Sequence, residues 1–109
     1  MIKLDTLAAG MYAVAEQRQK NGAGIKTDIL SMLKHTATEV VEATEAYCKC
    51  WLVDREQKKE FKERFVGELA DIIACVLIIA HQECVDMEKA LTECLKKNKD
   101  RAEGVGDKL

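Results

Sequence analysis

The chain has 109 residues, of which 48% are hydrophobic and 33% are charged, and its formal net charge is −2. These values fit one soluble globular domain and argue against a disordered chain. A balance this close to neutral gives no support to nucleic-acid binding through a basic field. Proline is absent, although average usage is about 5%, so the composition favours long uninterrupted helices.

The expected location is the cytoplasm, with no nucleic-acid or membrane partner. The start of the sequence lacks the charged-then-apolar plan of a signal peptide. The longest apolar run, Ile72 to Ala80, is shorter than the roughly 20 residues that span a bilayer. Five cysteines cannot all pair within one chain, so we expect reduced cysteines that serve mainly in packing.

The first helix is expected over about residues 2–20, because apolar residues recur there at helical spacing. The clearest break in the sequence, Asn21 to Gly24, ends it. Thr27 or Asp28 can cap a second helix that continues to about Leu52. Its apolar stripe is expected to face the core and consists of Leu30, Leu33, Ala37, Val40, Val41, Thr44, Tyr47, Cys48 and Trp51.

A charged segment, residues 53–59, is expected to be a connection, and the third helix to begin near Glu60. This helix should end near His81, and its all-apolar second half should be buried nearly all round. Asp86 is a suitable N-cap for a fourth helix, which becomes basic towards its end.

The fold class predicted from these elements is all-α, an antiparallel four-helix bundle completed by oligomerisation. A single domain is expected over residues 1–101, followed by a flexible tail over residues 102–109. On the third helix, Leu77 and Ile78 point away from the side that carries Ile72, Val76 and Ile79. One helix layer cannot cover both sides, so a homodimer or homotetramer is expected.

Two pairs of acids are the candidate functional residues. Glu39 and Glu42 on the second helix are three residues apart, as are Glu68 and Asp71 on the third, so each pair shares one side of its helix. By position alone, Glu39 and Glu42 would be an ordinary solvated face. The second pair adjoins an apolar run, where a carboxylate without a partner is costly. Four carboxylates on two packed helices suit Mg²⁺, or Mn²⁺, better than zinc.

The order and spacing of these acids resemble a known family. Glu39-x-x-Glu42, a spacer of 25 residues (43–67) and Glu68-x-x-Asp71 resemble the E-x-x-E and E-x-x-D signature of the MazG-like nucleoside triphosphate pyrophosphohydrolases. These enzymes belong to the all-α NTP pyrophosphatase superfamily. The similarity covers about residues 27–101 and includes the turn at residues 84–90, where Cys84 replaces the usual glycine.

The resemblance implies a Mg²⁺-dependent enzyme that cleaves a nucleoside triphosphate to the monophosphate and pyrophosphate. It implies that Glu39, Glu42, Glu68 and Asp71 hold the metal, with Glu39 or Glu42 as the general base. The same similarity implies that Lys97, Asn98 and Arg101 bind the triphosphate, although basic residues at a helix C-terminus also stabilise the helix dipole.

Two alternatives stay open at this stage. One is a non-catalytic helical oligomer whose acids bind a divalent ion to lock the assembly. The other lies within the same superfamily and is a dimeric dUTPase or a phosphoribosyl-ATP pyrophosphatase; the short chain with one motif set fits the MazG-like group better. Hydrolysis of a nucleotide separates the first alternative from the enzyme.

Overall fold

The computed structural model describes residues 2–104. Over these residues the chain is all-α, with no strand. It forms four helices, α1 (Leu4–Lys20), α2 (Ile29–Leu52), α3 (Arg55–Gln82) and α4 (Met87–Ala102). The predicted flexible tail begins inside the last turn of α4, and its residues 105–109 lie outside the described part of the chain.

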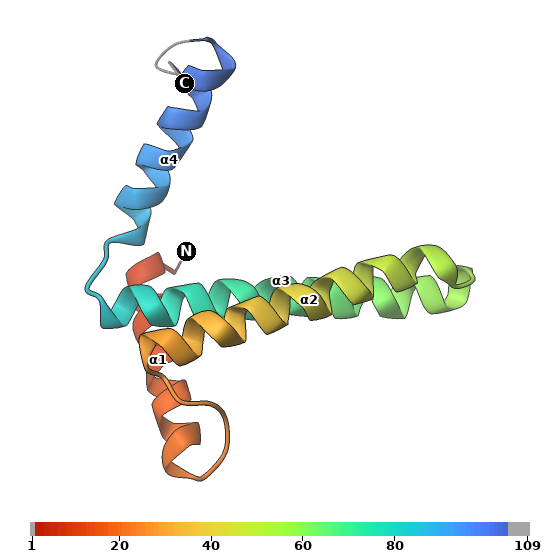
Figure 1. Ribbon diagram of the computed structural model, residues 1–109, viewed down its shortest axis with the longest axis horizontal. Coiled ribbons are helices and arrows are strands. Elements are labelled where there is room, and N and C mark those ends of the chain that lie inside the picture. Colours follow the sequence, from red (N-terminus) through yellow and green to blue (C-terminus); the bar gives the residue numbers. More distant parts are fainter. Residues whose placement is uncertain (1, 105–109) are drawn as a thin grey trace.

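An antiparallel hairpin of α2 and α3 forms the long axis of the molecule (Figure 1). Of the two N-caps expected for α2, Thr27 and Asp28, the structure shows Asp28, whose side chain accepts from the backbone N–H of Ser31. The predicted connection over residues 53–59 is wrong. Asp54 caps α3 by accepting from the N–H of Gln57 at 3.1 Å, so the helix begins at Arg55 and the charged residues form its solvated first turns.

The first helix crosses the open end of this hairpin (Figure 1). Side-chain hydrogen bonds hold the loop that follows α1 in place. The buried hydroxyl of Thr27 donates to Glu16 at 2.7 Å, and the backbone N–H of Thr27 donates to Gln19. The side-chain amide of Gln82 donates to the Thr27 carbonyl, so α1, its loop and the end of α3 are tied together.

The fourth helix points away from the hairpin (Figure 1). The side chain of Asp86 caps the N-terminus of α4 as predicted, by accepting from the backbone N–H of Lys89. A hydrogen bond from the Leu4 N–H to Glu88 links α4 to the start of α1. With this arm extended, the radius of gyration is 17.1 Å, whereas a compact domain of this length has about 13 Å.

The burial pattern corrects the expected core. The buried side of α2 carries Met32, Glu39, Ala43, Ala46 and Cys50. The predicted apolar stripe is exposed instead, and Trp51 keeps 66% of its surface accessible. On α3 the prediction of burial on every side is also wrong. Leu77 and Ile78 are buried, but a row of apolar side chains on the same helix is exposed, namely Val66, Leu69, Ile73 and Val76.

By length and composition alone, α3 could cross a membrane. The core helix of a soluble protein passes the same test, so this property is weak evidence. The helix also carries Glu68 and Asp71 inside its apolar half. Carboxylates at such positions are expensive in lipid unless they face a protein interior or a water-filled site.

Candidate metal and nucleotide site

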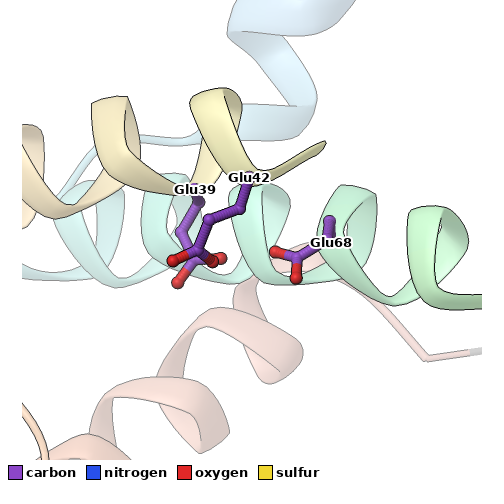
Figure 2. A group of neighbouring side chains, drawn as sticks. All are labelled: Glu39, Glu42 and Glu68. Carbon is purple, nitrogen blue, oxygen red and sulfur yellow. The ribbon is translucent and has the colours of Figure 1, made fainter. Parts of the chain in front are cut away.

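Three carboxylates meet in the middle of the hairpin. The acidic cluster consists of Glu39 and Glu42 from α2 and Glu68 from α3, and one oxygen of each lies within 4.8 Å of the others. Figure 2 shows the three carboxylates directed towards one another from the two helices. Because Ala43 and Ala46 are small and buried beside them, the helices can approach closely here.

Glu39 is the buried member of the acidic cluster, with 8% of its surface exposed. Burial, contact with the Glu68 carboxyl and the charges of Glu42, Glu68 and Asp71 raise the pKa of Glu39 to about 7. Among residues 2–104, no hydrogen-bond partner reaches Oε2 of Glu39 or Oε2 of Glu68, and both atoms are buried. Unpaired buried carboxylate oxygens are costly, so this arrangement favours a cation at the cluster.

The other oxygen of Glu39 has a neighbour on its own helix. Nε2 of His35, one turn earlier, lies 2.9 Å from Oε1 of Glu39. Asp71, the fourth predicted ligand, is exposed and is not within the 4.8 Å group. Its charge nevertheless acts on Glu39, and both residues line the same cavity, so Asp71 lies at the edge of the cluster.

A cavity of about 440 Å³ opens between α1, α2 and α3 next to the acids. Its wall is largely apolar, with Glu39 and Asp71 on one side and Arg18 and His35 as further polar groups. Burial is the main reason that the pKa of the Cys75 thiol is raised, so this wall residue stays a neutral thiol. The lining residues are Met11, Val14, Ala15, Arg18, Gly24, Ile25, Met32, His35, Glu39, Asp71, Ala74, Cys75 and Ile78.

A second cavity, of about 300 Å³, lies on the other side of the acidic cluster, towards the tip of the hairpin. Glu42 and Glu68 form part of its wall, and Lys49 and Arg64 bring two cations to it. Sequence reasoning did not single out these two basic residues. The signal was available in principle, since Arg64 lies one turn before Glu68 on the same side of α3.

The predicted triphosphate ligands lie elsewhere. Lys97, Asn98 and Arg101 are exposed on α4, which packs against α1 rather than against the hairpin. The amide of Asn98 contacts the sulfur of Cys94, 3.6 Å away, on its own helix. The structure of the single chain does not bring these residues to the acids, and their role stays a prediction.

The donor set of the cluster suits a hard cation. It contains carboxylate oxygens from three or four residues and no cysteine sulfur. Mg²⁺ and Mn²⁺ prefer such ligands, and Mg²⁺ keeps open positions that phosphate oxygens can fill. The acids and the two flanking cavities lie on one side of the hairpin, which is called the acidic face.

No protein-family model matches the chain, and comparisons with curated proteins and with solved structures found no match. The resemblance to MazG-like enzymes therefore depends on the sequence motifs alone, which are the acids with their spacing, the turn at residues 84–90 and the residues near the end of α4. What the fold adds is the position of the acids relative to each other and to the cavities.

Proposed function

We propose that the chain is a Mg²⁺-dependent nucleoside triphosphate pyrophosphohydrolase. The observation that carries the proposal is the acidic cluster, in which three carboxylates converge and two buried oxygens have no partner among residues 2–104. Glu39, Glu42, Glu68 and Asp71 would hold the ion. When bound, Mg²⁺ would neutralise phosphate charge and make water easier to deprotonate.

In this proposal the two cavities bind different parts of the substrate. The nucleoside occupies the larger cavity, whose size is within the range of small-molecule sites. The phosphates pass over the acids towards Lys49 and Arg64, where a guanidinium can donate two parallel hydrogen bonds to a phosphate. Lys97, Asn98 and Arg101 keep their proposed role only if α4 of the same chain or of a second copy approaches the cluster.

Two glutamates are candidates for the general base. Glu39 is buried, and one of its oxygens is next to His35. Glu42 is exposed and therefore accessible to water. We assign the base role to Glu42, which would take the proton of the water that attacks the α-phosphorus. The products are the nucleoside monophosphate and pyrophosphate.

The assembly and the location are part of the same proposal. We propose that the chain works as a homo-oligomer in the cytoplasm and that oligomerisation completes an antiparallel helical bundle. The open arrangement of the four helices and the small buried core support this, because a single chain leaves many apolar side chains uncovered.

The test is release of pyrophosphate from each ribo- and deoxyribonucleoside triphosphate in the presence of Mg²⁺. We expect release from at least one of them, with none after addition of EDTA. Mg²⁺ binding is measured separately by calorimetry. Binding without release from any nucleotide would reject the enzyme and leave a divalent-ion-binding helical oligomer.

A further inference from the structure

The hairpin has an uncovered apolar face opposite the acidic face. On α2 it consists of Leu30, Leu33, Ala37, Val40, Thr44, Tyr47 and Trp51, and on α3 of Val66, Leu69, Ile73 and Val76. All eleven side chains are exposed, and the larger apolar ones keep between 38% and 66% of their surface accessible. In both helices the spacing alternates between three and four residues, the pattern of helices that pack against other helices.

Both rows lie on the same side of the hairpin. Each row follows the buried row of its helix by one residue, which is a turn of about 100° around the helix axis. Because α2 and α3 run antiparallel, this turn brings both rows to one side. The positions one residue before the buried rows, such as His35 and Asp71, meet on the other side, where they line the larger cavity beside α1.

The apolar face has the size of a protein-binding surface. From Leu30 to Trp51 the row on α2 extends over about 32 Å, and from Val66 to Val76 the row on α3 extends over about 15 Å. At a width of roughly 10 Å for each helix, the flat footprint is about 470 Å², more than half of the roughly 800 Å² that each partner buries in a typical stable complex. A monomer rarely exposes a patch of this size without a binding role.

We propose that the occupant of the apolar face is a second copy of this chain. Related by a two-fold axis that lies in the plane between the two apolar faces, two hairpins meet with identical rows, so each supplies the helical surface that the other lacks. No charged residue interrupts either row between residues 30 and 51 or between 66 and 76 on this face. The resulting four-helix layer buries Val40 and Ile73 and leaves both acidic faces pointing outwards.

Two observations favour a second copy over a lipid surface. Residues 29–82 contain nine acidic and seven basic residues, so the hairpin has no cationic excess for anionic headgroups. The buried core of the single chain is also small, since Met32 is the largest side chain with less than 2% of its surface exposed. Association of two copies adds the core that one chain lacks.

The first test measures mass. Light scattering after size exclusion, in reducing agent because Cys48, Cys84 and Cys94 are exposed, should give twice the chain mass of 12.2 kDa. The double variant Val40→Lys/Ile73→Lys should elute as a monomer, whereas the control Thr38→Lys, exposed on α2 outside the rows, should keep the wild-type mass. A monomeric wild type, a dimer lost on reduction, or a double variant that stays dimeric would overturn the proposal.

The second test needs no variant. Trp51 is the single tryptophan of the chain and lies in the apolar face. In the wild-type protein its emission should be blue-shifted and its quenching by acrylamide several-fold weaker than for free tryptophan. Full access of acrylamide to Trp51 at high protein concentration would contradict the proposal, as would a blue shift that appears only with anionic vesicles. Neither test uses a nucleotide, so the outcome is independent of the proposed enzyme activity.

Discussion

Nε2 of His35 lies 2.9 Å from Oε1 of Glu39, and this contact fixes one oxygen of the most buried acid at the site. The opposite oxygen, Oε2, is left free to bind a cation in the acidic cluster. A residue that orients a ligand in this way affects metal affinity without touching the metal. His35 is therefore a positioning residue in the proposed site.

We predict that His35→Ala weakens Mg²⁺ binding by about tenfold, the lower end of the usual effect of residues that orient a metal ligand. Titration calorimetry measures the affinity, and far-UV circular dichroism checks the fold. The control is His81→Ala, the other histidine, whose ring lies 5.0 Å from that of Tyr12 at the end of α3. Equal Mg²⁺ affinities for the two variants would show that His35 has no positioning role.

The pKa of Glu39 predicts how the metal-free protein responds to pH. It is raised from the ordinary value of 4.5 to about 7, so the folded state holds this proton more tightly than the unfolded state. Stability is then greatest at low pH and falls as the pH rises through this interval. The loss is about 1.4 kcal/mol for each unit of pKa difference.

Urea denaturation of the metal-free protein between pH 5 and pH 8 measures this effect at constant protein concentration. In Glu39→Gln the free energy of unfolding should change little between pH 5 and pH 8. At pH 8 this variant should be more stable than the wild type. Added Mg²⁺ should stabilise the wild type above pH 7 and have little effect on Glu39→Gln. A wild-type protein that gains stability as the pH rises would contradict the assignment.

Local signals in the sequence predicted most of the helix ends and failed for the burial pattern. Asp28 and Asp86 cap their helices as predicted, because an N-cap depends on a few neighbouring residues. The start of α3 was missed because a charged segment without glycine or proline is equally compatible with a solvated helix. The signal for the true start of α3 was Asp54, which is the N-cap of this helix.

The buried side of α2 could not be chosen from hydrophobicity. This helix has two rows with the same three-and-four spacing, one rich in large apolar residues and one with Ala43, Ala46 and Glu39. In the single chain, close packing against α3 selects the row of small residues. The i, i+3 spacing of the acids places each pair on one side of its own helix. Which acids meet across the hairpin, and where Lys49 and Arg64 lie, depends on the register of the two helices, which the sequence does not give.

Asp71→Asn should abolish pyrophosphate release and leave the helical circular dichroism nearly unchanged. The carboxylate lies at the edge of the acidic cluster and is exposed, so its loss removes a proposed ligand without disturbing packing. Glu63→Gln, an exposed acid on the same helix that lines neither cavity, is the matched control and should retain activity. Activity that survives in Asp71→Asn would mean that the metal ligands are wrongly assigned.

Arg64→Gln should raise the KM for the nucleotide by about tenfold, since a hydrogen bond to a charged group contributes about 1.5 kcal/mol or more. Arg64 and Lys49 are the cations that line the smaller cavity. Arg55→Gln removes the same charge at the first residue of α3, outside that cavity, and should leave KM unchanged. If both variants behave alike, the phosphates do not lie in this cavity.

Cys84→Gly should stabilise the protein, because Cys84 is the non-glycine residue with positive φ, 54°, in the described part of the chain. It follows the C-cap of α3, and the N–H groups of Cys84 and Val85 donate to the carbonyls of His81 and Ala80, which is the pattern of a Schellman motif. A left-handed conformation costs an L-residue about 1 kcal/mol, and part of this cost is recovered with glycine, which is more flexible when unfolded. The expected gain is about 0.5 kcal/mol, whereas Cys94→Gly, the same change inside α4, should lose about 0.3 kcal/mol, the difference in helix propensity between cysteine and glycine. Chemical denaturation measures both, and a loss of stability in Cys84→Gly would show that the thiol contributes more than the backbone strain costs.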